Sequence, residues 1–495
     1  MKKLSLFFRK HWFYFCIGFI LLIAAGVYFY NFENRWGLSY DQARDVIVAR
    51  EALQTHAIPL IGPFSSAGQF IYGPQWFWVL MLMIGIYPNA IITPWVIQIL
   101  LYIMMVFVMI VIGKEIGGKI LALFIGLFTA VSPAQMSQAT NLTSPSMVSI
   151  FSIATVYFFV LFIKEGKPLH AFLLGFFIAT AINTHFQAIG LLVLIPVSLI
   201  FSKRTIRIFL SLALGLFIPF IPLLIFDLKT NFYETRGFLD YYFYGQYRIY
   251  VPNRWLTYAG VFWPNVWART IGGNVILGYI TIGLLSIITI YSFFKRNISK
   301  PLISIIISFL TMFIMLRYFR GERFDSYVVF LHPFILILTG WVVYYLFRLN
   351  YFLGVIACAA LIVGSMYLNV AEIKSATNYT AIRATSWRQM LTKKFSGKKF
   401  ALYDYGYKSA RYSLPLVLFL QADGKLSDYG YKIGFGNPPE EQRSFHPEIK
   451  ENMGGFTLRD LNSSSSAELT KEGWSFINPN AIYRSTEEWY VGEKL

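Results

Sequence analysis

Most of this chain consists of apolar runs close to the length of a membrane span. An α-helix needs roughly 20 apolar residues to cross a bilayer, and a hydrophobic content of 56% exceeds that of ordinary soluble domains. The runs lie at residues 12–30, 91–113, 120–131, 146–163, 169–182, 188–201, 206–226, 275–294, 303–316, 327–347 and 352–370. The sequence therefore predicts a polytopic α-helical membrane protein with about 11 transmembrane helices.

Basic residues set the expected orientation, because Lys and Arg in short loops stay on the cytoplasmic side. Lys2, Lys3 and the basic connectors at 114–119, 164–167, 203–207, 295–300 and 348 are therefore expected inside. This leaves outer segments at 31–71, 132–145, 227–274 and beyond 370. With residues 31–71 outside and 114–119 inside, only one of the two apolar stretches between them crosses the membrane. We expect that the stretch 72–87 does not cross, and its prolines and aromatic residues favour a helix in the membrane interface. We expect a multi-pass cell-membrane protein with a cytoplasmic N-terminus and an extracytoplasmic C-terminus.

The net charge of +18 follows from this topology, since most of the excess sits in connectors between spans. Nucleic acid is therefore not an expected partner. Cys16 and Cys358 lie within predicted spans, so the sequence predicts no disulfide framework.

We expect two domains. A membrane domain covers residues 1–370 and includes a first outer loop with juxtamembrane helices (31–74) and a second large outer loop (227–274). A small soluble α/β domain covers residues 371–495. Its pattern predicts strands at 399–403 and 429–435, a helix at 409–421, and a second half through 455–461 and 474–477.

Acidic residues are rare before residue 371 and cluster in the first outer loop. These loop acids are Glu33, Asp41, Asp45 and Glu51. Carboxylates are costly beside lipid, so a cluster there needs a reason. Ser39 followed by Gln42 matches a capping box and predicts a helix from about residue 40 to 54. On this amphipathic helix Asp41 and Asp45 stand one turn apart and share a face.

Two motifs and the layout resemble the GT-C superfamily of glycosyltransferases. The motifs are Asp41-Gln42-Ala43-Arg44-Asp45 and Gly73-Pro74-Gln75-Trp76-Phe77-Trp78. The branch they resemble contains protein O-mannosyltransferases and lipid A aminoarabinose transferases, in glycosyltransferase family 39. Those families typically carry Asp-Glu where this chain has Asp41-Gln42, so a second carboxylate would have to come from Asp45. Several relatives also carry an acid where the link 132–145 has none, so a divalent cation is not supported.

The resemblance implies a polyprenyl-phosphate-dependent enzyme that transfers one sugar, with inversion, to an acceptor hydroxyl on the outer membrane face. The acceptor is a lipid, a glycan or a protein. Transfer needs a base for the hydroxyl proton and cations for the leaving phosphate. Asp41 is the expected base, and Asp45 either orients hydroxyls or balances Arg44. The alternative is that both acids only cap and solvate a surface helix.

Arginine is the expected partner of the lipid phosphate, because its guanidinium fork matches phosphate oxygens. The candidate phosphate ligands are Arg317, Arg320 and Arg323 in one outer connector, and His185 between two spans. The candidate substrate contacts are Gln42, Arg44, Tyr72 and Trp76. The alternatives are arginines that extend to lipid headgroups and a hydrogen-bonded structural histidine.

Two other classes of function remain open. A flippase or transporter of polyprenyl-linked glycans would also be polytopic, but it requires charges along a path between helices. A non-catalytic membrane scaffold would depend on the C-terminal domain and would tolerate Asp41→Ala.

Overall fold

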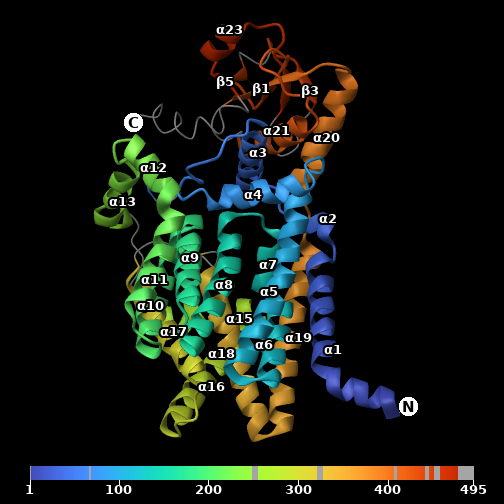
Figure 1. Ribbon diagram of the computed structural model, residues 1–495. Helices are drawn as coiled ribbons and strands as arrows, with labels where there is room; N and C mark the ends of the chain where they lie inside the picture. Colours follow the sequence, from blue (N-terminus) through green and yellow to red (C-terminus); the bar gives the residue numbers. More distant parts are fainter. Residues whose placement is uncertain are drawn as a thin grey trace. The chain divides into compact units, whose positions relative to one another are not determined.

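The computed structural model describes residues 2–65, 68–247, 255–319, 327–405, 410–440, 445–450 and 457–477. Most of them are helical (Figure 1). The chain forms two compact units. The first unit comprises Met1–Phe32, Leu60–Trp76 and Trp95–Ala376, and the second comprises Glu33–Pro59, Phe77–Pro94 and Thr377–Leu495. The first predicted outer loop thus contributes to both units. The domain boundary at residue 370 stays a prediction.

Eight helical segments of the described residues are long and apolar enough to cross a membrane. They are Lys10–Phe29 in α1 (Lys2–Phe29), α5 (Thr93–Gly117), α8 (Ser144–Glu165), Ile206–Lys229 (α11, Ile206–Phe217; η2, Ile218–Phe220; α12, Ile221–Lys229), α16 (Val275–Phe294), α17 (Lys300–Tyr318), Val329–Leu349 (η6, Val329–Leu331; α18, His332–Leu349) and Tyr351–Lys394 (α19, Tyr351–Ser375; α20, Tyr379–Lys394). A ninth results if α6 (Lys119–Val131) and α7 (Pro133–Thr140), which are bent by 52°, form one span.

The predicted fold class, a polytopic helical protein with a small sheet domain, is confirmed. The span count differs because two predicted spans are short helices. They are α9 (Pro168–Thr184) and Phe186–Phe201, which joins η1 (Phe186–Val193) to α10 (Leu194–Phe201). The helix α4 (Gln75–Ile86) has 12 residues, or about 18 Å at 1.5 Å per residue. That length is well below the roughly 30 Å of a bilayer core, as expected for a segment that does not cross.

Glycines bring the helices α9 and α11 close together. A Cβ on Gly175 of α9 would lie 2.6 Å from the Leu212 carbonyl oxygen of α11, and a Cβ on Gly215 of α11 would overlap the Phe172 carbonyl of α9. Small residues at such contacts let helix backbones approach each other. This packing holds the first half of α9 against α11, and His185 follows directly after the C-terminal end of α9.

An antiparallel pair of short segments precedes α4 and holds Tyr72 in place. Gly62 N donates to the Tyr72 carbonyl oxygen at 2.8 Å, and Tyr72 N donates to the Pro63 carbonyl oxygen at 3.0 Å. A Cβ on Gly62 would overlap the Gly73 carbonyl oxygen, so the close pairing requires glycine there. The predicted turn before the aromatic helix is therefore built by backbone hydrogen bonds.

The C-terminal part contains a five-stranded mixed sheet with the order β3-β4-β2-β1-β5. Its elements are β1 (Phe400–Tyr405), α21 (Ala410–Ala422), β2 (Tyr431–Phe435), β3 (Glu448–Lys450), β4 (Leu458–Asp460), α23 (Ser466–Lys471) and β5 (Trp474–Phe476). β1 and β2 are parallel, and α21 lies between them in the chain. The strands and helix predicted for the tail are confirmed.

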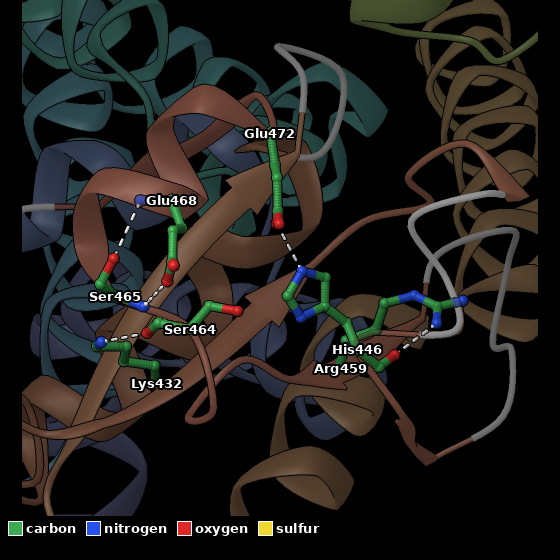
Figure 2. A network of polar contacts seen from close by, with 7 residues as sticks. All are labelled: Lys432, His446, Arg459, Ser464, Ser465, Glu468 and Glu472. Carbon is green, nitrogen blue, oxygen red and sulfur yellow. Dashed lines mark hydrogen bonds and ion pairs between the residues drawn. The ribbon is translucent and has the colours of Figure 1, made fainter.

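Polar contacts hold the loops of this sheet domain (Figure 2). His446 Nε2 lies 2.6 Å from Glu472 Oε2, and the His446 side chain has no exposed surface. Arg459 donates to the His446 carbonyl oxygen at 2.8 Å, and Lys432 donates to the Ser464 carbonyl oxygen at 2.6 Å. Because each bond joins different segments, this network stabilises the domain.

The helix α3 (Tyr40–Gln54) has the predicted start and length. Ser39 N donates to Gln42 Oε1 at 3.0 Å, which is the hydrogen bond that the N-cap backbone makes in a capping box. Ten of its 15 residues are buried, and α3 packs against α21 in the same unit. The helix is therefore more buried than an amphipathic surface helix would be, and one of its contacts is with a segment more than 300 residues later in the chain.

Candidate functional site

Asp41, Arg44 and Asp45 form one ion-pair cluster at the start of α3. Arg44 Nη1 lies 3.1 Å from Asp41 Oδ1, and Arg44 Nη2 lies 2.7 Å from Asp45 Oδ1. Arg44 Nε also donates to Asp45 Oδ1 at 2.8 Å. The Asp45 side chain is 4% exposed, whereas that of Asp41 is 60% exposed. The cluster therefore holds Arg44 through a buried carboxylate and leaves the Asp41 carboxylate accessible.

The charge of Arg44 is stabilised by its surroundings. Burial alone would lower the pKa of the guanidinium, but the Asp45 and Asp41 carboxylates raise this pKa above its ordinary value. The guanidinium carbon also lies 5.5 Å from the centroid of the Tyr40 ring, a favourable cation–π distance. A fixed cation therefore stands beside an accessible carboxylate.

Gln42 and Trp76, two predicted substrate contacts, are packed side chains. Gln42 is 6% exposed and caps α3 through Ser39, while Trp76 is fully buried. Their predicted contacts with substrate stay predictions.

Tyr72 and His185 form a second cluster, within the first unit. Their rings stack with centroids 4.6 Å apart, and the Tyr72 hydroxyl lies 3.3 Å from His185 Nε2. The Tyr327 ring lies 5.7 Å from the His185 ring. Tyr72 is 9% exposed and His185 is 7% exposed. The structure thus brings together two candidates that are more than 100 residues apart in the sequence.

Burial lowers the pKa of His185 to about 4. The imidazole is therefore neutral at neutral pH. A neutral ring can form a hydrogen bond with a phosphate oxygen, but it supplies no positive charge.

Sequence reasoning missed two acids of the second large loop: Glu234 bonds to the segment that carries Tyr72, and Asp227 holds the start of the helix that carries Glu234. Glu234, in the first turn of α13 (Tyr233–Phe243), accepts a hydrogen bond from Ile71 N at 2.8 Å. Asp227 accepts bonds from Thr235 N at 3.1 Å and Thr235 Oγ1 at 2.5 Å. Burial raises the pKa of Glu234 to about 8, although the bond from Ile71 N opposes this shift. The sequence did offer a signal for this contact, because Asp227 and Glu234 lie close together in a region of the chain that is otherwise poor in acids.

Arg317 lies at the end of α17 and is 3% exposed. Its guanidinium carbon is 5.0 Å from the Trp255 ring centroid and 5.9 Å from that of Tyr318. The side chain is therefore packed against aromatic rings. Arg320 and Arg323 lie outside the described residues.

The candidate residues thus fall into local groups. Asp41, Gln42, Arg44 and Asp45 belong to the second unit, and Tyr72, Trp76, His185 and Arg317 belong to the first. In the described part of the chain, no three His, Cys, Asp or Glu residues are grouped as metal ligands would be.

The fold, with its helical membrane part and its small α/β part, is similar to the folds of two solved structures. ArnT from Cupriavidus metallidurans bound to undecaprenyl phosphate superposes with a TM-score of 0.63 at 11% identity, over 91% of this chain and 98% of that one. The oligosaccharyltransferase of Archaeoglobus fulgidus superposes with a TM-score of 0.52 at 14% identity, over 79% of this chain and 59% of that one. These similarities establish the fold. No family model matches the sequence, and no curated protein matches it either.

Proposed function

We propose that this protein is a glycosyltransferase that moves one sugar from a polyprenyl-phosphate donor to an acceptor hydroxyl on a lipid, a glycan or a protein. The observation that carries the proposal is the accessible Asp41 carboxylate beside a fixed Arg44, in a chain with the GT-C fold. One structure with this fold is ArnT bound to undecaprenyl phosphate. Another is an archaeal oligosaccharyltransferase in complex with an inhibitory peptide and a dolichol-phosphate.

In the proposed reaction Asp41 removes the proton from the acceptor hydroxyl. The hydroxyl oxygen attacks the anomeric carbon on the face opposite the phosphate and forms the new glycosidic bond. The bond from the anomeric carbon to the phosphate oxygen breaks, and the phosphate leaves with the electron pair. Configuration at the anomeric carbon is inverted. Asp45 serves to fix Arg44, as the two short contacts between them favour.

Cations would stabilise the charge that develops on the leaving phosphate. Arg317 is our candidate among the described residues, with Arg320 and Arg323 as further candidates beyond them. His185 would donate or accept a hydrogen bond as a neutral ring, since its pKa is about 4. Tyr72 would keep that ring in place through their stacking contact. We place the reaction on the outer membrane face, with the N-terminus in the cytoplasm.

A transporter is the second candidate class. It would require charged residues along a path between the helices. In the described spans, however, the acids Glu115, Glu165, Asp227 and Glu372 stand in the last turns of their helices. This distribution favours chemistry at the ends of the spans over passage through them.

The test is a chromosomal deletion complemented with variants, followed by mass spectrometry of cell glycans and lipids. We expect the wild-type chain to restore a glycosylated product that the deletion lacks. Asp41→Asn should fail to restore it, while Glu33→Gln, which removes another acid from the same loop, should restore it. Full product from Asp41→Asn at equal protein level would remove Asp41 from the mechanism.

A further inference from the structure

A pocket opens between the ends of several helices of the first unit. It holds about 480 Å³ of space, part of which is open to the surroundings of the protein. Its walls come from α7, from α15 (Trp263–Thr270), from the start of α18 and from the last turns of α19. We call it the polar pocket, and its lining residues with polar side chains are Ser137, Gln138, Arg269, Thr270, His332 and Glu372.

The polar pocket also has apolar walls. Val266, Val328 and Leu368 contribute to them. Pockets that bind small molecules combine apolar walls with a few polar groups that fix the orientation of the ligand. The topology that we propose places the lining parts of α7, α15, α18 and α19 toward the outer membrane face. The pocket is therefore expected on the side of the membrane where the sugar would be transferred.

His332 offers one ring nitrogen to the pocket. The residue is 3% exposed, and its Nδ1 lies 3.1 Å from Gln135 Nε2. An amide nitrogen can only donate, so Nδ1 accepts this bond and the ring carries its proton on Nε2. In the described part of the chain Nε2 has no hydrogen-bond partner, yet it is not among the unpaired atoms that lack accessible surface. The Nε2–H group is therefore a donor that a ligand in the pocket can reach.

Buried hydrogen bonds hold Gln135 and the pocket walls in place. Gln135 Nε2 donates to Ser149 Oγ at 3.2 Å, and Gln135 N donates to Ser132 Oγ at 3.2 Å. Ser132 Oγ donates to the Thr270 carbonyl oxygen at 2.5 Å, which joins the start of α7 to the end of α15. All four residues are buried. These bonds fix the direction of the His332 ring.

A cation and a carboxylate also line the polar pocket. Arg269 and Glu372 supply them, and both residues are exposed. A guanidinium only donates hydrogen bonds and a carboxylate only accepts them, so the pocket offers both kinds of partner. A hydroxyl group donates and accepts, whereas an ionised phosphate only accepts and is repelled by a carboxylate. The lining therefore suits a ligand with several hydroxyl groups.

We propose that the polar pocket binds a sugar ring. His332 Nε2 donates to one hydroxyl oxygen, Glu372 accepts from another hydroxyl, and the apolar walls pack against the C–H groups of the ring. The ring belongs to the polyprenyl-phosphate donor or to a glycan acceptor, since both present the same chemistry. This inference rests on the proposed function for the presence of a sugar substrate.

The first experiment tests the donor sugar. It measures the affinities of purified full-length protein for undecaprenyl phosphate and for the same lipid carrying a hexose, a pentose or an N-acetylhexosamine. The wild-type protein should bind at least one sugar-bearing lipid about 10-fold more tightly than the bare lipid. Ser137→Trp, which fills the pocket from an exposed position of α7, and His332→Phe, which removes the donor, should reduce that ratio to about 1. Affinity for the bare lipid should stay unchanged.

The second experiment tests the acceptor sugar with methyl glycosides of the same three sugars. If the pocket holds the acceptor, saturation-transfer NMR should show that the wild-type protein binds at least one glycoside. Ser137→Trp and His332→Phe should lose this binding, while the lipid affinity ratio should be the same in the wild type and the variants.

Two further variants serve as controls. His332→Gln places an amide N–H close to the position of Nε2–H, so it should bind the sugar more tightly than His332→Phe does. His170→Phe makes the same ring exchange in the first turn of α9, and no residue of α9 lines the pocket. This variant should keep the wild-type values.

Three results would overturn the inference. One is a wild-type protein that neither prefers a sugar-bearing lipid nor binds a glycoside, and another is equal sugar binding by the wild type and Ser137→Trp. The third is an equal loss of affinity for bare undecaprenyl phosphate in Ser137→Trp, which would assign the pocket to the phosphate or to folding. The glycan product in cells judges the proposed function separately. Product without sugar binding at the pocket refutes only this inference, and sugar binding without product refutes only the proposed function.

Discussion

The Asp41 ion-pair cluster and the cluster of Tyr72 and His185 hold their polar groups in opposite ways. In the cluster, a buried carboxylate and an accessible one share the charge of Arg44. In the second cluster, the rings of Tyr72 and His185 stack with centroids 4.6 Å apart, and both side chains are buried. The first arrangement suits proton transfer, which needs a base held in place. The second suits a fixed hydrogen-bonding group, because burial keeps the His185 ring neutral.

The largest stability effect is expected from Arg44→Met. This change leaves the buried Asp45 carboxylate without its cation, and losing one partner of a buried pair is strongly destabilising. Because Arg44 is partly exposed, we expect a loss of about 2 kcal/mol. The double variant Arg44→Met/Asp45→Asn should lose less than Arg44→Met alone. Unfolding of both variants in detergent checks this order, and equal losses would show that the contact between Arg44 and Asp45 is not what stabilises the cluster.

Gly62→Ala should disturb the segment that carries Tyr72 and Gly73. Its Cβ would overlap the Gly73 carbonyl oxygen, and backbone atoms cannot move aside cheaply. We expect a loss of about 1–2 kcal/mol, in the lower part of the range for overpacked sites. Gly85→Ala is the control, because Gly85 lies in α4 with nothing near its Cβ position. That helical substitution should be neutral or stabilising. Similar melting temperatures for both variants would contradict the close pairing of the two segments.

Glu234 should make stability fall as the pH rises. Its pKa is about 8 in the folded protein, whereas an unfolded Glu ionises near ~4.3. Between these values the folded state binds more protons, so stability is complete below the lower value and is lost as the pH approaches 8. Melting temperatures measured from about pH 5 to about pH 8, roughly the interval between the two pKa values, check this. Glu234→Gln should flatten the profile, and Asp240→Asn on the same helix should not. An unchanged profile in Glu234→Gln would refute the assignment.

His185 should give a smaller effect of the opposite sign. Its folded pKa is about 4, and an unfolded His titrates near ~6.5. The unfolded state therefore binds more protons between these values, so stability falls as the pH drops through that interval. His185→Gln should remove this acid-side loss, while His56→Gln should keep it. A loss of undecaprenyl phosphate binding above pH 7 that follows His185 would instead mean that the ring acts as a cation, roughly as an unperturbed histidine would.

Much of the local structure could be predicted from the sequence. Ser39 and Gln42 located the start of α3, since a capping box depends on residues three apart. The Gly73-Pro74 step located the start of α4, and the residue pattern of the tail located β1 and β2. These features depend on neighbouring residues, which is why periodicity and punctuation reveal them.

Contacts between distant segments could not be predicted. The burial of α3 depends on its packing against α21, and the support of Tyr72 depends on Glu234. Gln75 and Asn183 also meet beside Gly73, although 108 positions separate the two amides. No local pattern encodes such a meeting. The short helices α9 and α10 also altered the span count, because hydropathy alone does not show where a helix breaks.

The most direct test of the central claim is a kinetic comparison of wild-type and Asp41→Asn protein with donor lipid and acceptor. Asn keeps the size of the side chain but cannot take a proton. We predict that kcat falls by about 100-fold or more while affinity for undecaprenyl phosphate stays at the wild-type value. An unchanged kcat, or a loss confined to affinity for the lipid, would contradict the assignment of Asp41 as the base.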